Sequence, residues 1–243
     1  ESTSPIDVLT AEDIRKAGVL NGELGSALQA LLPSFNFPRQ SNSGGADHVR
    51  AAQLRGLSPD QVLVLINGKR RHTSALVNTG SKTGKGTTPV DFNAIPVSAI
   101  KRIEVLRDGA GAQYGSDAVA GVINVILNDA PEGGAWEASY GLHRTDVEPI
   151  NQTLTDGQTT FLSGQVGDRI GSEGGFFRVG FEYKNREGTN RAGFDQIPFF
   201  EEQTPDNLAL AGKRNYHLGD GDSKALNAWI NSVVPLNESA EFY

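Results

Sequence analysis

Two glycine-rich runs contain residue types that could hold a phosphate group. Residues 80–86, GSKTGKG, imitate a phosphate-binding loop, in which backbone N–H groups and a lysine surround phosphate oxygens. The run has three residues between its first two glycines, where that motif needs four, and a glycine replaces the required Ser or Thr. Gly109, Gly111 and Gly115 imitate a dinucleotide fingerprint, but the third glycine comes one residue late. Neither run therefore predicts a nucleotide site.

Side chains for covalent catalysis or metal binding are scarce. The chain contains no Cys, which excludes a thiol nucleophile, a thiolate metal site and a disulfide framework. It has four histidines, which are His48, His72, His143 and His217. Their spacing is not that of metal ligands, and Asp220 and Asp222 suit a loop turn better than a calcium site. With no Ser nucleophile elbow and no paired carboxylates, the sequence predicts no enzyme, no metal and no cofactor.

The composition excludes further classes of protein. The 243 residues include 29 acidic and 22 basic side chains, a net charge of −7, which argues against nucleic-acid binding. No apolar run approaches the roughly 20 residues of a membrane helix. The longest apolar runs, residues 62–66 and 122–127, have the length of strands. Membrane strands alternate apolar and polar residues, so they would produce no longer run than these.

Up to residue 131, short strands should alternate with short helices. The expected strands cover residues 6–9, 61–66, 69–72, 103–106 and 121–127, and the expected helices cover residues 11–17 and 23–32. Thr10 and Asp13 resemble a capping box at the start of the first helix. Asn67-Gly68 is a strong hairpin signal between two of the strands.

After residue 131, the sequence predicts only alternating strands and polar loops. The expected strands cover residues 136–142, 158–167, 177–184 and 225–236, with a further strand beginning at residue 241. An apolar-out, polar-in membrane barrel and a soluble β-sandwich share this alternation. The long connection of residues 185–223 fits the extracellular loops of outer-membrane barrels, whereas a sandwich prefers shorter connections.

The most informative segment is residues 95–127, IPVSAIKRIEVLRDGAGAQYGSDAVAGVINVIL. Together with residues 53–56, QLRG, and 62–68, VLVLING, it resembles the plug signature of TonB-dependent outer-membrane receptors. The positions that match the signature are Gly56, Asn67, Gly68, Glu104, Gly109, Tyr114, Gly115 and Gly121. The resemblance in specific motifs extends over residues 5–131, and beyond them it is carried by the strand pattern alone.

The resemblance implies a fold in two parts. Residues 1–131 would form the α+β plug domain, a small mixed sheet with short helices. Residues 132–243 would form the N-terminal antiparallel strands of a transmembrane β-barrel, truncated here, since barrels of this family have about 22 strands. The barrel would lie in the Gram-negative outer membrane, in contact with lipid and lipopolysaccharide.

The implied function is the uptake of a scarce small-molecule nutrient, energised by TonB with ExbB and ExbD. A ferric siderophore is the leading expectation, and a saccharide or other organic nutrient is the alternative. No convincing TonB box precedes Ile6, so we expect the coupling segment to be truncated or disordered. A soluble carbohydrate- or peptide-binding module with a β-sandwich tail is the alternative from another class, and solubility without detergent would favour it.

Two arginines match family positions whose guanidinium groups contact the barrel wall. Arg55 and Arg107 would pair with carboxylates on later strands, because a bidentate Arg–carboxylate pair fixes two surfaces together. Local ion pairs with Glu104 or Asp108 are the alternative for both arginines.

Ligand contacts are expected in the two long polar loops of the plug, residues 37–48 and 70–88, because plug apices face the extracellular side. The candidates are Arg39, Gln40, His48, Arg71, His72, Asn78, Lys82 and Lys85. Basic residues of the second loop could attract an anionic ligand such as a ferric chelate. For each residue, an ordinary solvated loop is the alternative.

Overall fold

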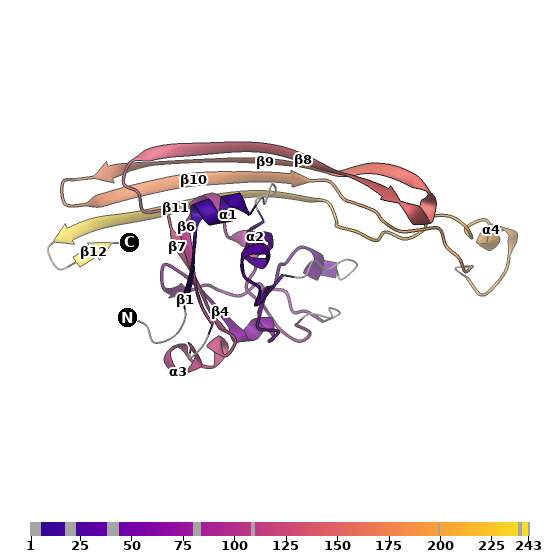
Figure 1. Ribbon diagram of the computed structural model, residues 1–243, viewed down its shortest axis with the longest axis horizontal. Helices are drawn as coiled ribbons and strands as arrows, with labels where there is room; N and C mark the ends of the chain where they lie inside the picture. Colours follow the sequence, from indigo (N-terminus) through magenta and orange to yellow (C-terminus); the bar gives the residue numbers. More distant parts are fainter. Residues whose placement is uncertain are drawn as a thin grey trace.

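The chain folds into a small α/β domain that packs against one face of a long antiparallel sheet (Figure 1). The computed structural model describes residues 6–17, 23–37, 44–79, 84–107, 110–198, 200–237 and 240–242. The strands of the small domain end at Leu127, and those of the long sheet begin at Gly133.

The N-terminal domain contains three helices and seven strands in its described part. In chain order they are β1 (Ile6–Thr10), α1 (Ala11–Lys16), α2 (Leu24–Leu31), β2 (Phe35–Asn36), β3 (Gln53–Leu54), β4 (Val62–Ile66), β5 (Lys69–Arg70), β6 (Ile100–Leu106), α3 (Ala110–Tyr114) and β7 (Gly121–Leu127). The β2–β3 pair, which forms a separate two-stranded sheet, was not predicted. Each of its strands is only two residues long and gives no periodic signal.

The main sheet of this domain has the strand order β1-β6-β7-β4-β5. Its β4 and β7 are parallel, and the other neighbours are antiparallel, so the sheet is mixed as expected. Asn67 and Gly68 turn β4 into β5 with φ values of 49° and 77°, the left-handed conformation that a two-residue hairpin requires. Gly121 starts β7 at φ 144°, where an added Cβ would lie 2.5 Å from the Leu106 carbonyl oxygen.

The core of the domain lies between the main sheet and α1 and α2. Thr10 caps α1 through the predicted capping box, in which its side chain accepts a hydrogen bond from the Asp13 N–H. Leu28 of α2 and Ile103 and Val125 of the sheet are fully buried in one apolar cluster. The central strands β6, β7 and β4 thus form a rigid base for the loops at their ends.

The second sheet, here called the wall, has the order β12-β11-β10-β9-β8 and is antiparallel throughout. Its strands are β8 (Gly133–Val147), β9 (Gln152–Ile170), β10 (Gly175–Arg186), β11 (Ser223–Asn237) and β12 (Ala240–Phe242). Each of the first four is longer than predicted, because polar residues continue the ladder past the apolar stretches that give the alternating signal. A short helix, α4 (Pro205–Leu208), lies in the long β10–β11 connection.

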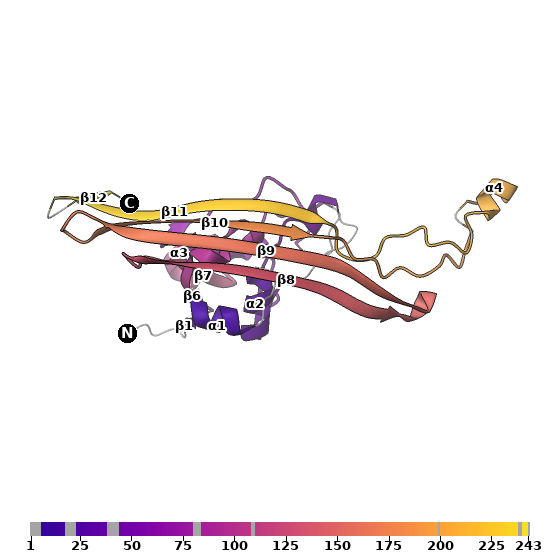
Figure 2. The same cartoon turned by 90° about the horizontal axis from the view of Figure 1, so that it is seen from above.

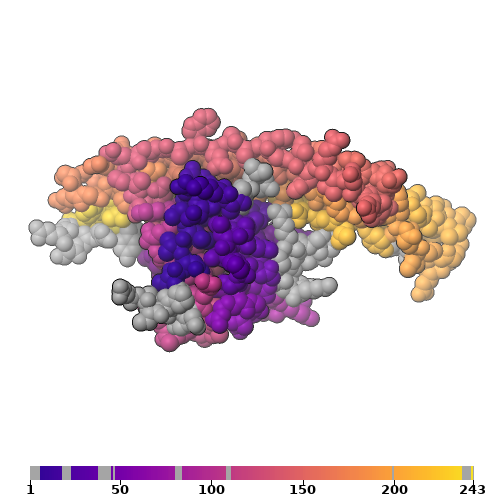
Figure 3. Space-filling view, viewed as in Figure 1, coloured from indigo at the N-terminus to yellow at the C-terminus, as the bar shows by residue number. Residues whose placement is uncertain are grey.

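The figures show how the two parts lie against each other. The N-terminal domain covers one face of the wall (Figures 1 and 3), and β1 and α3 lie on the side away from α4 (Figure 1). Seen from above, the long strands run side by side, and the connection with α4 projects beyond their end (Figure 2). Within the described ranges, no α-helix is long and apolar enough to cross a membrane.

Candidate functional site

The two faces of the wall differ in chemistry. On β10, Arg178, Glu182 and Arg186 share one face of the strand, lie beneath the N-terminal domain and are buried. Phe181, between them in sequence, is 47% exposed on the opposite face. The wall therefore presents a polar face to the N-terminal domain, as the alternation predicted.

The outer face of the wall is an exposed apolar surface. Trp136 is 86% exposed and Ile230 is 66% exposed. The other large apolar side chains exposed on this face are Tyr140, Leu142, Leu162, Val166, Phe181, Leu226 and Leu236. A continuous apolar surface of this kind marks contact with lipid or with another apolar surface.

One contact joins the wall to the turn before β6. The backbone N–H of Ser98, in a single helical turn over Val97–Ala99, donates to Glu182 Oε1 at 2.6 Å. Trp229 of β11 donates from Nε1 to Ser98 Oγ at 3.2 Å. Both wall groups are side chains of the inner face, so this turn is held by two neighbouring strands.

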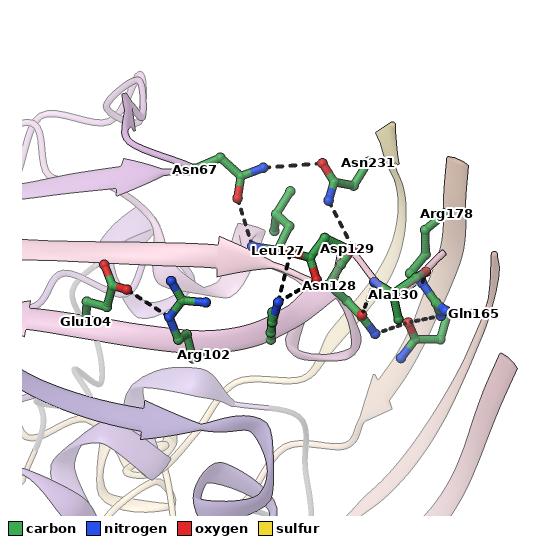
Figure 4. Close-up of polar contacts among 11 residues, drawn as sticks. Asn67, Arg102, Glu104, Leu127, Asn128, Asp129, Ala130, Gln165, Arg178 and Asn231 are labelled. Atoms are coloured by element: carbon green, nitrogen blue, oxygen red, sulfur yellow. Dashed lines mark hydrogen bonds and ion pairs between the residues drawn. The ribbon is translucent and has the colours of Figure 1, made fainter. Parts of the chain in front are cut away.

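A second set of contacts surrounds the end of β7 (Figure 4). The Asn128 side-chain amide donates to Gln165 Oε1 of β9 at 3.1 Å, while the Asn231 amide of β11 donates to the Asn128 carbonyl at 2.9 Å. Asn67 of the β4–β5 hairpin donates to Asn231 Oδ1 at 3.3 Å and accepts from the Leu127 N–H at 2.9 Å. Neutral amides thus connect the central sheet of the domain with two strands of the wall.

Arg178 holds the segment that links the two sheets. Its guanidinium, 3% exposed, donates to the carbonyls of Ala130 (3.0 Å), Glu132 (2.8 Å) and Gly133 (3.2 Å). It also donates to Gln165 Oε1 at 3.1 Å. One buried side chain therefore fixes the path of the chain from the domain into the wall.

A third contact is ionic and largely buried. Glu23, just before α2, is 1% exposed, and its Oε1 accepts from Arg186 Nη1 at 2.9 Å and Lys184 Nζ at 3.1 Å. Its Oε2 accepts from the Ser26 hydroxyl at 3.2 Å, and Arg186 also donates to the Gly221 carbonyl at 3.0 Å. We call these side chains of Glu23, Lys184 and Arg186 the Glu23 cluster.

The ligand-contact candidates fall into three groups. Arg39, Gln40 and Lys82 lie outside the described residues. His48, Arg71, His72 and Lys85 lie in the described loops, where Arg71 is half-buried and the other three are exposed. Figure 1 shows the loops of the N-terminal domain on the side that faces the α4 end of the wall.

Asn78 differs from the other candidates because it is only 3% exposed. Its backbone N–H donates to the Thr87 carbonyl at 3.0 Å, and its own carbonyl accepts from the Gly86 N–H at 2.8 Å. These two bonds close the loop onto itself, as does a third between the Ser74 N–H and the Pro89 carbonyl at 2.8 Å. The Asn78 backbone therefore organises the loop that carries Lys85.

His48 lines a cavity of about 270 Å³ between the domain and the wall, together with Asp91, Lys184, Arg186 and Lys224. Burial raises the pKa of the Asp91 carboxyl above its ordinary value, although its Oδ1 accepts two backbone hydrogen bonds. These come from the N–H groups of Arg50 and Asn93, at 3.0 Å each. Among the described residues, no group of His, Asp and Glu side chains could hold a metal ion.

Arg55 and Arg107 make contacts within the N-terminal domain. Arg107 pairs with Asp7 of β1, from Nη2 to Oδ1 at 2.9 Å and from Nε to Oδ2 at 2.8 Å. Arg55 donates from Nη1 to the Arg107 carbonyl at 2.7 Å. The local partner of Arg107 is therefore Asp7 and not Glu104, which pairs with Arg102 at 2.8 Å. The other local alternative, Asp108, lies outside the described residues. Contact with carboxylates of later strands stays a prediction.

The remaining described signature positions lie in strands β6 and β7, in α3, and in the turns that follow β3, β4 and α3. Gly56, Asn67, Gly68, Gly115 and Gly121 all adopt positive φ. Glu104 accepts from Arg102 and from the Asn124 side chain across to β7, Tyr114 ends α3, and Gly109 lies outside the described residues. The signature thus marks backbone turns and sheet contacts more than an exposed site.

Comparison with known proteins identifies this architecture. The model of the TonB-dependent Receptor Plug Domain matches residues 1–122, half of the chain. The chain belongs to the TonB-dependent receptor family. The N-terminal domain is therefore the plug, and the wall is a part of the barrel that surrounds the plug in this family of outer-membrane β-barrels, which are receptors and not enzymes.

Individual relatives are similar over most of this chain. The ferrienterobactin receptor of Escherichia coli (strain K12) is 32% identical over 229 residues, which are 94% of this chain and 28% of that protein. The vitamin B12 transporter of Vibrio vulnificus is 33% identical over 161 residues, 66% of this chain and 24% of that protein. The crystal structure of a ferric enterobactin receptor mutant from Pseudomonas aeruginosa superposes with a TM-score of 0.59 at 26% identity, covering 77% of this chain and 25% of that one. The chain thus spans about a quarter of these relatives.

The resemblance read from the sequence is confirmed, and with it the plug fold followed by antiparallel barrel strands. At about 3.3 Å per residue, strands of 12–19 residues exceed the roughly 30 Å of hydrocarbon in a bilayer. The exposed apolar face of the wall is accordingly the face toward lipid. Its polar face lines the lumen that the plug occupies.

Sequence reasoning missed the residues that join plug and wall most closely. Arg178, Glu182 and Lys184 were recognised only as the polar half of an alternating strand. A charged residue at every second position of an apolar strand is a signal for a buried polar interface, and it could have been used. Glu23 gave no signal, since a single carboxylate before a helix is ordinary.

Proposed function

We propose that this chain forms the plug and first barrel strands of a transporter that takes up a ferric siderophore across the outer membrane. TonB, with ExbB and ExbD, would supply the energy. The observation that supports the proposal best is the polar character of the plug–wall interface. Amide hydrogen bonds and ion pairs join the two parts.

A polar interface suits a plug that must move. The net contribution of an ordinary hydrogen bond is only about 0.5–1.5 kcal/mol, because water replaces the lost partner. An apolar interface of similar size would expose its surface to water on opening, at about 25 cal/mol per Å². A plug held by hydrogen bonds and ion pairs can therefore separate from the wall at lower cost and return to the same register.

The substrate class is proposed from two observations. Relatives similar to most of this chain include receptors named for ferrienterobactin and ferric enterobactin. The described plug loops also carry basic or titratable side chains that are exposed at His48, His72 and Lys85 and half-buried at Arg71. Together with Arg39, Gln40, Asn78 and Lys82, these residues remain our candidates for ligand contact. A positive loop would concentrate an anionic chelate at the plug.

A second candidate is an organic nutrient such as cobalamin. It is favoured by the 33% identity to the vitamin B12 transporter of Vibrio vulnificus. The same interface and the same energy source would serve it, and a saccharide belongs to this alternative. The plug–wall geometry does not distinguish these ligands, so a transport measurement is needed to distinguish them.

The experiment is an uptake assay in cells that lack other outer-membrane receptors for siderophores and cobalamin. The full-length receptor is expressed with and without a functional tonB gene, and radiolabelled ferric enterobactin and cyanocobalamin are supplied separately. TonB-dependent accumulation of iron supports the siderophore proposal. Accumulation of cobalamin alone replaces it with the second candidate. No TonB-dependent accumulation of either ligand overturns the assignment of both ligands.

A further inference from the structure

Described residues of the plug and the wall line two cavities between them. The larger, about 550 Å³, is lined by Ile14 of α1, Val97, and the wall residues Ser163 and Gln165. The smaller, about 270 Å³, is lined by His48 and by residues near the start of β11, including Lys224. Cross-strand register places the smaller cavity toward the long β10–β11 connection and the larger toward the short β9–β10 turn.

The cavities meet at two shared residues. Both Glu23 and Phe161 line each of them. Phe161 is 4% exposed and lies opposite Lys184 in the β9–β10 register. The Glu23 cluster therefore stands where one cavity ends and the next begins, and it joins α2 of the plug to β10 of the wall.

The ion pairs of the Glu23 cluster are strong when intact, but they can separate and form again. Removing one partner of a buried ion pair costs about 3–5 kcal/mol, because the other charge is left uncompensated. Separating the partners into water restores the solvation of each, so the net cost of opening is much smaller than that. Such a contact opens when water or a polar ligand replaces the partner, and closes when it leaves.

Arg186 extends the cluster to the loop outside the wall. Its Nη2 donates to the Gly221 carbonyl, in the connection that follows β10. The same connection is closed by the Thr189 N–H, which donates to the Asp220 carbonyl at 2.9 Å. Movement of this connection would therefore shift the Arg186 side chain, which donates to Glu23.

We propose that the Glu23 cluster is a latch that closes the passage between the two cavities, so that ligand moves along β8–β11 only when α2 separates from β10. This inference rests on the proposed transport function. It assigns Glu23, Lys184 and Arg186 a gating role that differs from the predicted role of Arg55 and Arg107. The proposal also means that the plug separates from the wall on one side only, where it contacts the first barrel strands.

The test is a reversible cross-link across the latch. Glu23→Cys with Arg186→Cys is introduced into the full-length receptor, in a background without other reactive cysteines, and joined by a short bismaleimide with a cleavable disulfide spacer. This chain supplies no cysteine of its own. Uptake is measured before cross-linking, after it, and after reduction of the spacer. The same protein thus reports its own folding, since the first measurement precedes the cross-link.

A matched control joins another plug–wall contact. Asn67→Cys with Asn231→Cys connects the β4–β5 hairpin to β11, where the native amides are 3.3 Å apart. We expect the latch cross-link to remove the TonB-dependent uptake and reduction to restore it. The control cross-link should leave at least half of the uptake.

Unchanged uptake in the cross-linked latch, or an equal loss in the control, would overturn the latch. If the wild-type receptor itself shows no TonB-dependent uptake, the transport function has failed instead, so the two failures are distinguishable. Should the Glu23 variant not assemble, Ser26→Cys with Lys184→Cys places the cross-link at the same boundary. That pair leaves the Glu23–Arg186 contact intact.

Discussion

Arg178 offers the sharpest test of how plug and wall are joined. Replacing it with alanine removes a side chain that donates to three carbonyls of residues 130–133 and to Gln165. The loss should loosen the linker locally, because β10 keeps its backbone ladder with β9 and β11.

The magnitude follows from which acceptors can be hydrated afterwards. Glu132 and Gly133 are exposed, so water replaces the guanidinium at their carbonyls. Ala130 and Gln165 are half-buried and lose their bonds with less compensation. A hydrogen bond to a charged group contributes about 1.5–3 kcal/mol, so two such bonds give a loss of at least about 3 kcal/mol. Since 1.4 kcal/mol is a factor of ten, the linker should open about 100-fold more often.

Amide hydrogen exchange of the full-length receptor in detergent measures this opening. The N–H groups of Asn128 and Ala130 are suitable probes, because they donate to the Ala99 carbonyl (2.7 Å) and to Asn128 Oδ1 (3.1 Å). Their exchange should accelerate about 100-fold in Arg178→Ala. Arg178→Lys, which keeps the charge but has a single donor nitrogen, should give an intermediate value. Wild-type protection in Arg178→Ala would refute the assignment of Arg178 as the residue that holds the linker.

Three further predictions concern packing, lipid contact and pH. Gly25→Ala should lower the free energy of unfolding by about 1–3 kcal/mol, because the added Cβ would lie 2.2 Å from the Phe37 ring, whereas Gly111→Ala meets open space and should not destabilise the plug. Ile230→Lys, at the centre of β11 on the lipid face, should cost about 2–4 kcal/mol in folding experiments with vesicles, and an effect near zero would contradict lipid contact. Burial raises the pKa of Asp91, so the folded plug binds this proton more tightly than the unfolded chain does, and wild-type stability falls as pH rises from the ordinary pKa of 3.8 to the raised value. Asp91→Asn should lack that fall. Its free energy of unfolding relative to wild type should therefore rise with pH in the same range and then level off. A difference in the free energy of unfolding that stays constant across acid titrations would contradict the argument.

The secondary structure could be predicted wherever a local rule applied. The capping box at Thr10, the hairpin at Asn67-Gly68 and the apolar run of β7 each depend on neighbouring residues alone. The long strands of the wall were predicted, but with too few residues at their ends. Their polar ends are part of the strands only because they form backbone hydrogen bonds with the adjacent strand. The local sequence does not show which strand will be adjacent.

The functional contacts were predicted less well than the elements that carry them. Arg107 was expected to meet the barrel, and within this chain it meets Asp7, a residue 100 positions away that β1–β6 pairing brings near it. Asn78 was a candidate for ligand contact in a polar loop, and the loop folds over it and buries it. A side chain's partner depends on which surfaces meet, and spacing along the chain does not encode that.

The sequence by itself determined the family, the plug fold and the two faces of the wall, because motif glycines and period-2 alternation are properties of the local chain. Only the tertiary structure decided which polar residues join plug to wall. Glu23 and Arg186 are 163 residues apart, and neither is unusual where it stands. They become a buried ion pair because the start of α2 meets β10 and water is excluded from both side chains. That exclusion, and not the identity of either residue, makes the contact strong enough to close a passage and polar enough to open again.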